Sequence, residues 1–266
     1  MIRMAKELTM LSPTRLEAYM RRAAALTHDV VDLPPFMLFF NPHDPLRFFN
    51  YARPVEPVGG DLQERLDALC TAFHARERLP RCEFIEEFAP DLAPALRAAG
   101  FAEEGRQLLL ICTPEALRPA PDVPGLAITQ LTIAAPMDDL RACVAVQQRG
   151  FGNPDAPSAS AAEGEDQRRR VAAGAGAFLA RLDGQPVGVA DFTTPLGGLT
   201  ELVGIATLEA YRGRGIATAL TARAVQVTFD AGAEIAFLVA EDARAGRVYE
   251  RVGFRPCATA LAYSRG

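Results

Sequence analysis

The chain has 266 residues, of which 49% are hydrophobic and 23% are charged, and its net charge is −5. This composition is typical of a globular protein that can bury a sizeable core, and the length predicts one large or two ordinary domains. The acidic balance argues against a general nucleic-acid-binding protein, because that function needs a basic surface.

Cysteines and histidines indicate neither a disulfide framework nor a metal site. The five cysteines are far apart, odd in number and without a CxxC pair, so we expect free thiols in a reducing cytoplasm. The three histidines lie in the first third of the chain at spacings that suit no metal. The start, MIRMAKELTML, lacks the apolar core of a signal peptide, and no apolar run is long enough to span a membrane. We therefore expect a cytoplasmic protein without a metal or a membrane partner.

Helices and strands are predicted to alternate in the first part of the chain. Residues 61–73 carry Leu62, Leu66, Leu69 and Phe73 along one face, which predicts an amphipathic helix. The elements predicted after this helix are a strand at 82–88, a helix at 91–101 and a closing strand at 106–113.

A proline-rich segment divides the chain. Residues 113–125, TPEALRPAPDVPG, contain four prolines, which fix φ and remove backbone donors, so the segment is predicted to be a semi-rigid connector. We therefore expect two domains, residues 1–120 and 121–266.

The second part begins with a predicted antiparallel meander. The Asp183-Gly184 pair suits the positive φ angles of a tight hairpin turn. In the polar helix of this part, the run QRRR at 167–170 is predicted to be a solvated face. The expected elements are a strand at 126–132, a helix at 137–148, a loop at 150–160, a polar helix at 161–174, and strands at 177–182, 185–192 and 199–207.

The remaining segments are predicted to follow a helix–strand–helix–strand order. Asp242 is a candidate N-cap and Gly253 a candidate stop for the second helix. The predicted elements are a helix near 214–231, a buried strand at 235–240, a helix that begins after Asp242, and a strand at 258–264.

The stretch YRGRGIATAL, residues 211–220, combines glycine and positive charge at a helix start. The first N–H groups of a helix have no intrahelical partner and carry partial positive charge, so a helix start can bind an anion. Gly213 and Gly215 let a phosphate approach the backbone, and Arg212 and Arg214 add charge. This pattern predicts a pyrophosphate site. The alternative is a solvated loop whose arginines pair with surface carboxylates.

Two common nucleotide motifs are excluded by context. A P-loop needs GxxxxGK[ST], which is absent, and a Rossmann fingerprint needs a third glycine where this chain has Thr218. The strands before the loop are also predicted to form hairpins and not βαβ units.

Two segments resemble the Gcn5-related N-acetyltransferase (GNAT) superfamily. VGIATLEAYRGRGIATAL resembles its acyl-CoA-binding segment, whose Q/R-x-x-G-x-G/A loop is matched by residues 212–217. VAEDARAGRVYERVGF resembles the family's next strand, helix and Tyr-x-x-x-Gly-Phe ending. The chain departs from the usual pattern at Glu209, where proline is frequent, and at Asp242, where asparagine is frequent. The resemblance covers residues 126–266 and implies an α/β fold of the α+β type with a mixed sheet.

The resemblance also implies how the cofactor binds. Backbone groups of a splayed strand would bond the pantetheine amides, an N–H near Ile205 and Ala206 would meet the oxyanion, and the glycine–arginine loop would hold the pyrophosphate. The implied acetyl-CoA-binding residues are Ile205, Ala206, Thr207, Arg212, Gly213, Arg214, Gly215, Ile216, Ala217 and Thr218.

Catalytic roles are implied for two residues. Tyr249 matches the family's general acid, which protonates the departing thiolate; the alternative is a core tyrosine. Glu201 stands where relatives often have a glutamate that removes a proton from the amine; the alternative is a solvent-facing carboxylate. Glu163, Glu165 and Asp166 are a further set of carboxylates that could line the substrate mouth.

The first part of the chain resembles the second without its chemistry. Residues 91–101 resemble residues 243–254, but Leu96 stands where Tyr249 stands. The segment PVGGD, which leads into the predicted helix at 61–73, contains no arginine, and its Asp61 would repel a phosphate at that helix start. We expect a degenerate, non-catalytic GNAT-like domain; the alternative is coincidence.

These features together predict an N-acetyltransferase that moves an acetyl group from acetyl-CoA to an amine of a small molecule or peptide. The acidic balance slightly favours a cationic amine. The alternatives are a non-catalytic acyl-CoA-binding or sensing protein and a nicotinamide-cofactor enzyme. A homodimer is compatible with the sequence, which carries no signal for the oligomeric state.

Overall fold

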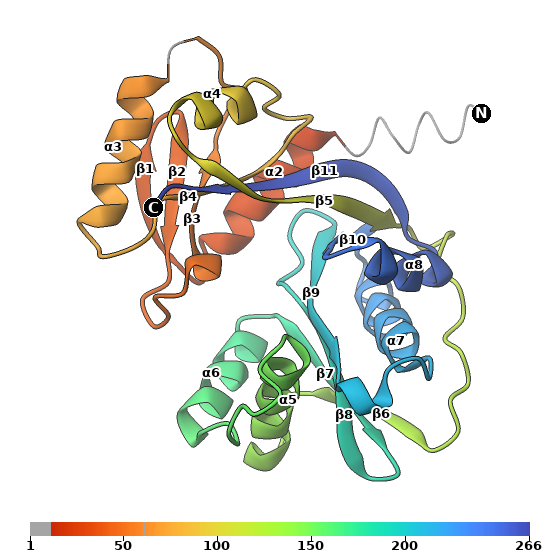
Figure 1. Cartoon of the computed structure of the whole chain (residues 1–266). Helices are drawn as coiled ribbons and strands as arrows, with labels where there is room; N and C mark the ends of the chain where they lie inside the picture. Colours follow the sequence, from red (N-terminus) through yellow and green to blue (C-terminus); the bar gives the residue numbers. More distant parts are fainter. Residues whose placement is uncertain (1–11, 61) are drawn as a thin grey trace. The chain divides into compact units, whose positions relative to one another are not determined.

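The computed structural model describes residues 12–60 and 62–266, which belong to two compact units (Figure 1). Unit 1 runs to Leu109 and also takes in Cys257–Gly266, and unit 2 is Leu110–Pro256. The units therefore do not divide at residue 120 as predicted. The reason is that the last residues of the chain pair with a strand of unit 1. The N-terminal segment used to argue against a signal peptide, and Asp61, lie outside the described residues.

Unit 1 contains the helix–strand–helix–strand order predicted for the first part of the chain, as α3, β4, α4 and β5, and β3 precedes it. Its strands follow the order β1-β2-β3-β4-β11-β5. Strand β3 is parallel to β4, whereas β1–β2, β2–β3 and β4–β11 are antiparallel. The elements are α2 (Pro13–Ala24), β1 (Asp29–Leu33), β2 (Phe36–Phe40), the 3-10 turn η1 (Arg47–Phe49), β3 (Asn50–Pro54), α3 (Gln63–His74), β4 (Arg81–Ile85), α4 (Leu92–Ala98), most of β5 (Ala102–Cys112) and most of β11 (Arg255–Ser264).

Unit 2 contains the predicted meander. Strands β6 to β9 pair antiparallel with their neighbours, and β10 is parallel to β9, which makes the sheet mixed, as expected. The elements are β6 (Leu126–Leu131), α5 (Met137–Gly150), α6 (Ala161–Ala172), β7 (Gly176–Leu182), β8 (Gln185–Phe192), β9 (Leu199–Thr207), the 3-10 turn η2 (Glu209–Tyr211), α7 (Ile216–Asp230), β10 (Ile235–Ala240) and α8 (Ala243–Val252).

Both faces of the unit 2 sheet are covered (Figure 1). On one face, Phe178 and Ala180 of β7 pack in a buried cluster with α7. On the other, Ala177 and Leu179 pack with Leu140 of α5. Alternate residues of one strand thus serve different layers, as the period of two in a strand dictates.

Three sequence-based expectations concern the whole chain. All five cysteines are free thiols, as predicted. No helix within 12–60 and 62–266 is both long and apolar enough to cross a membrane. Within the same residues, no three or more His, Cys, Asp or Glu side chains cluster as a metal site would require.

Candidate functional site

Strands β9 and β10 pair at their beginnings and then part. Their parallel register joins Leu199 to Ile235 and ends with Glu201 opposite Phe237, although β9 continues to Thr207 and β10 to Ala240. Backbone groups of a strand point alternately to its two sides, so beyond Glu201 alternate groups of β9 face a gap and not a paired strand. An extended ligand can bond such groups as an added strand would.

A β-bulge interrupts β9 inside this gap. The register of β8 and β9 shifts between Val189 and Asp191, so that Gly204 and Ile205 together oppose Ala190. Gly204 has a φ of +63°, a conformation that favours glycine. The bulge turns the following peptide group, and it does so where the resemblance placed the oxyanion donor.

The loop after β9 ends in a helix start without a side-chain cap. Gly213 and Gly215 have φ values of +78° and +82°, and Gly215 is the N-cap of α7. The first backbone bond of the helix runs from Ala219 N to Gly215 O at 2.9 Å. The N–H groups of Gly213 to Thr218 therefore have no acceptor in the part of the chain that the structure describes. Unpaired N–H groups at a helix start can bind an anion, so the geometry is compatible with the pyrophosphate site, which stays a prediction.

The two arginines of this loop bond to backbone and ring groups. Arg212 donates from Nε to Thr207 O and from Nη2 to Gly150 O, both at 3.1 Å. The guanidinium of Arg214 lies 5.3 Å from the centre of the Tyr211 ring. Neither arginine has a carboxylate at ion-pair distance among the described residues, so the alternative of surface ion pairs does not hold.

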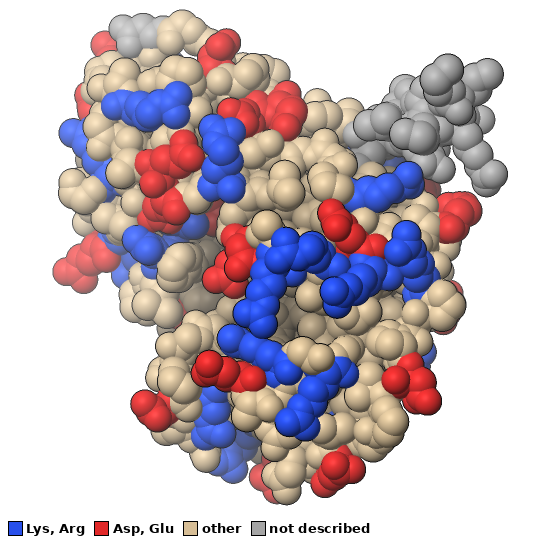
Figure 2. Space-filling view, turned by 45° about the vertical axis from the view of Figure 1, so that its right-hand side comes forward, with Lys and Arg blue, Asp and Glu red and all other residues tan. Residues whose placement is uncertain are grey.

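Positive charge is distributed unevenly in unit 2. The arginines of α5, α6 and β7 that form ion pairs with carboxylates are Arg141, Arg168, Arg169, Arg170 and Arg181. The arginines of α7, of α8 and of the loop before α7 have no such partner among the described residues; they are Arg212, Arg214, Arg223, Arg244, Arg247 and Arg251. Figure 2 brings the side of α7 and α8 forward and shows basic side chains gathered there. This face attracts anions although the whole chain is acidic.

Tyr249 lies on α8 and is half-buried. Helix α8 begins as predicted, with Ala245 N donating to Asp242 Oδ1 at 2.7 Å. The Tyr249 ring packs against the main core of unit 2, with its centre 6.2 Å from that of Phe254. Burial, together with the charges of Glu241 and Asp242, raises the pKa of Tyr249 to about 12. The hydroxyl therefore stays protonated at neutral pH and can donate a hydrogen bond.

Glu201 is the last residue of β9 that pairs with β10, so it stands where the two strands part. Its backbone is fixed by Thr193, whose N–H donates to Glu201 O at 2.8 Å and whose hydroxyl accepts from Glu201 N at 3.1 Å. The half-buried position at the mouth of the gap suits the expected role in proton removal, which stays a prediction.

The carboxylates of α6 are held by local contacts. Glu163 closes a capping box with Ser160 at the start of the helix. Glu165 and Asp166 form ion pairs with arginines three residues later on α6. These contacts explain the three carboxylates without a substrate, and their placement at a substrate mouth stays a prediction.

The structure adds a buried carboxylate that sequence reasoning missed. Asp191 on β8 is 1% exposed; its Oδ2 accepts from Gln167 Nε2 at 3.3 Å and lies 3.6 Å from Arg170 Nη2. Its Oδ1 is buried without a partner among the described residues. Burial raises the pKa of Asp191, and the charge of Arg170 opposes this. The prediction of a solvated face was wrong for Gln167, which is buried. The sequence signal for a buried carboxylate was that Asp191 is the single carboxylate in the otherwise apolar strand QPVGVADF.

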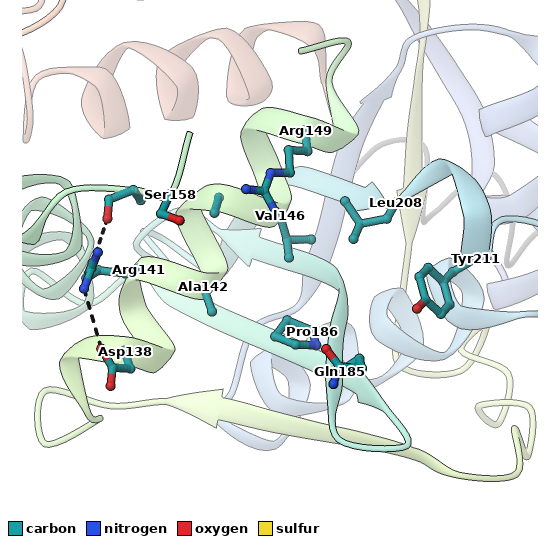
Figure 3. Close-up of a pocket in the computed structure, with 12 residues that line it drawn as sticks. Asp138, Arg141, Ala142, Val146, Arg149, Ser158, Gln185, Pro186, Leu208 and Tyr211 are labelled. Atoms are coloured by element: carbon teal, nitrogen blue, oxygen red, sulfur yellow. Dashed lines mark hydrogen bonds and ion pairs between the residues drawn. The ribbon is translucent and has the colours of Figure 1, made fainter. Parts of the chain in front are cut away.

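A cavity of about 420 Å³ lies beside α5 (Figure 3). Leu208 and Tyr211, which precede the glycine–arginine loop, line it, but none of the predicted site residues does. Arg141 in its wall is bound to Ala159 O at 2.6 Å and lies 3.7 Å from Asp138. The predicted cofactor site is therefore not this cavity but the open gap between β9 and β10.

Comparisons with known proteins agree with this geometry. Residues 141–254 match the family model described as Acetyltransferase (GNAT) family. A GCN5-related N-acetyltransferase from Kribbella flavida is 28% identical, with a TM-score of 0.78 over 95% of each chain. One from Sphaerobacter thermophilus is 17% identical, with a TM-score of 0.60 over 88% of this chain and 82% of the other. A tandem GNAT protein of clavulanic acid biosynthesis is 16% identical, with a TM-score of 0.59 over 86% and 77%. The last two similarities show the fold alone, and no curated protein matched.

Proposed function

We propose that this chain, whose residues 141–254 match the acetyltransferase (GNAT) family model, transfers an acetyl group from acetyl-CoA to an amine in unit 2. One observation carries the proposal: a gap between parallel strands leads directly into an uncapped helix start flanked by two arginines. Coenzyme A has a matching order of parts, an extended amide-containing arm followed by a pyrophosphate.

The cofactor would lie along the gap and end at the loop. The backbone of Ile205 and Thr207 would bond the pantetheine amides, in the manner of an added strand. The N–H groups of residues 213–218 would bind the pyrophosphate, with charge from Arg212 and Arg214. Since Arg212 also bonds the end of β9, binding of phosphate there would keep the loop and the strand together.

The chemical step would be direct attack by the amine nitrogen on the thioester carbonyl. The C–N bond forms, the carbonyl oxygen gains negative charge, and the N–H of Ile205 or Ala206 meets it. The C–S bond then breaks and the thiolate leaves. An amine with a pKa near the lysine value of about 10.4 is mostly protonated at neutral pH, so a group such as Glu201 must take its proton.

Tyr249 would stabilise the leaving thiolate. Full proton transfer from a hydroxyl of pKa about 12 to a thiolate of ordinary pKa about 8.5 is uphill by about 5 kcal/mol. Before cofactor binds, Tyr249 is therefore a hydrogen-bond donor and not a strong acid. A bound phosphate-bearing ligand that changes the surroundings of Tyr249 would alter the pKa difference between this hydroxyl and the leaving thiol.

The first part of the chain would be a degenerate GNAT-like domain that does not bind the cofactor. Its element order supports this, as does its similarity in fold to a protein described as a tandem GNAT.

Titration calorimetry and a thiol-release assay test the proposal. We expect one acetyl-CoA per intact chain, and release of free thiol with at least one member of a panel of polyamines, aminoglycosides and lysine peptides. Binding without turnover across the panel would favour a sensing protein, and two sites per chain would refute the degenerate first domain. Binding of NADH in place of acetyl-CoA would overturn the proposal.

A matched pair of glycine variants locates the binding site. Gly215 and Gly232 stand at opposite ends of α7, both with positive φ. Gly215→Glu places a carboxylate in the predicted phosphate site, whereas Gly232→Glu places one in open space. Acetyl-CoA at a hundred times its Kd should add about 2.7 kcal/mol to the unfolding free energy of the wild type and of Gly232→Glu, and almost nothing to Gly215→Glu. Equal stabilisation of both variants would place the site elsewhere.

A further inference from the structure

The peptide group between Gly204 and Ile205 is held from the helix side of the sheet. Gln147 of α5 donates from Nε2 to Gly204 O at 3.4 Å. A trans peptide is planar, and its C=O and N–H point in opposite directions. A donor that fixes the Gly204 carbonyl toward α5 therefore turns the Ile205 N–H away from α5.

The approach of Gln147 depends on the absence of a side chain at the bulge. A Cβ on Gly204 would stand 2.0 Å from Gln147 Nε2 and 3.7 Å from Asp191 Oδ2. The bulge, the glutamine amide and the buried carboxylate are thus in one contact group. The side-chain amide of Gln147 also favours the ionised form of the Asp191 carboxylate and thereby opposes the rise of its pKa.

The charge of Asp191 determines which end of the Gln147 amide faces the bulge. An ionised carboxylate only accepts hydrogen bonds, so it selects the NH₂ end of the glutamine. The same NH₂ group then has a second hydrogen for Gly204 O. With the amide reversed, its oxygen would face the Gly204 carbonyl oxygen, which is repulsive.

The remaining contacts hold the carboxylate in place. Gln167 and Arg170, both of α6, contact Asp191 Oδ2. Asp191 is therefore fixed by α6 while it orients a residue of α5. Gln147 therefore contacts the peptide group directly, and Asp191 acts on it only through Gln147.

We propose that Asp191 is a positioning residue that, through Gln147, aims the Ile205 N–H at the thioester oxygen of acetyl-CoA. This inference rests on the proposed function. Hydrogen bonds weaken steeply with misalignment, and loss of one oxyanion donor lowers kcat by about 10²–10³-fold. Misdirection of this N–H should therefore have a similar effect on turnover, with little effect on cofactor affinity.

Three variants separate this role from simple packing. Asp191→Asn keeps the shape but can donate to the Gln147 oxygen and so favours the reversed amide. Gln147→Met removes the amide at similar volume. Gln148→Met is the control, because Gln148 is the next residue of α5 and bonds Glu163 Oε1 at 2.8 Å, not the bulge. Thermal unfolding of all three reports any general loss of stability.

The readout is the infrared carbonyl stretch of ¹³C-carbonyl acetyl-CoA bound to each protein, measured without an amine. In the wild type and Gln148→Met we expect a lower stretching frequency than for free acetyl-CoA, and in Asp191→Asn and Gln147→Met at most half of that shift. Calorimetric Kd should stay within about threefold in all four proteins. Where an amine substrate is known, kcat of the two variants should fall about 10²-fold.

The outcomes separate the two proposals. An unshifted frequency in the wild type would contradict the oxyanion site of the proposed function. A full shift in the wild type that persists in both Asp191→Asn and Gln147→Met would overturn the positioning role alone. A loss of shift in Gln148→Met equal to that in Gln147→Met would also overturn it, because a packing defect of α5 would then suffice.

Discussion

Two parts of the chain follow one order of elements and treat the gap between their parallel strands differently. The order β3–α3–β4–α4–β5 is repeated by β9–α7–β10–α8–β11. The first strand is parallel to the second in both cases. In our proposal the gap between β9 and β10, the second gap, is left for a ligand. The gap between β3 and β4, the first gap, is filled by the chain itself.

The ends of α4 and α8 have the same local geometry. Phe101 N donates to Leu96 O at 2.9 Å, and Phe254 N donates to Tyr249 O at 3.1 Å. Each phenylalanine follows a glycine that ends the helix, and each is buried. Leu96 and Tyr249 thus hold equivalent positions, which agrees with the sequence comparison and makes coincidence a poor explanation.

The first gap is closed by a buried ion pair. Strands β3 and β4 have a single paired position, Ala52 opposite Cys82. Glu17 of α2, fully buried, accepts from Ile85 N at 2.6 Å and from Arg53 Nε at 3.0 Å. Since the neighbouring Glu86 N bonds to β11, the Ile85 N–H points toward β3, and Glu17 thereby occupies a backbone donor of the gap. A carboxylate from the chain does there what a ligand would do in unit 2.

The largest expected effect comes from removal of this closure. Glu17→Ala leaves Arg53 buried without its main partner, which should lower the unfolding free energy by about 3–5 kcal/mol. The matched control is Glu86→Ala, which breaks the half-exposed Glu86–Arg106 pair and should cost less than about 1 kcal/mol. Urea denaturation of both variants measures the difference. If both variants lost similarly small amounts of unfolding free energy, the Glu17–Arg53 ion pair would not be what holds the first gap closed.

A smaller effect is expected from the hydroxyl that distinguishes the two helix ends. Tyr249→Phe keeps the packing but removes the donor, so kcat should fall about 10²-fold while acetyl-CoA affinity changes little. Tyr263→Phe is the control: its hydroxyl bonds Glu103 in unit 1, and its loss should leave kcat unchanged. Unchanged kcat of Tyr249→Phe, measured under conditions where the chemical step limits the rate, would mean that Tyr249 has no part in the mechanism and that its difference from Leu96 has no catalytic meaning.

The smallest effect concerns stability at alkaline pH. Tyr249 has a pKa of about 12 when folded and about 10 when unfolded. Between these values the unfolded state has lost the proton that the folded state keeps, so the unfolding free energy falls as pH rises. At pH 11 this should amount to about 1.4 kcal/mol. Chemical denaturation at pH 8 and pH 11 should show a loss smaller by that amount in Tyr249→Phe than in the wild type; equal losses would contradict the burial of the hydroxyl.

Local patterns predicted the elements, and the anion site that they also indicate stays a prediction. The Asp183-Gly184 hairpin, the strands at 199–207 and 235–240 and the Asp242 cap are where the sequence placed them. Each of these features depends on residues that are close in the sequence, through turn chemistry, an apolar run or helix capping. The unit boundary was mispredicted because the pairing of β11 with β4 joins residues about 180 positions apart, and proline content says nothing about such pairing.

The sequence by itself determined the order of elements, the arginine–glycine loop and the loss of that loop's chemistry in the first part, since each is a matter of residue type and short-range spacing. Only the tertiary structure decided that β9 and β10 part after Glu201, that Glu17 fills the corresponding gap in unit 1, and that Asp191 is buried beneath the bulge. The physical reason is that burial and partnership of a charge depend on which distant segments pack around it. A carboxylate in a strand is ordinary in sequence and becomes significant when α5 and α6 exclude water from it.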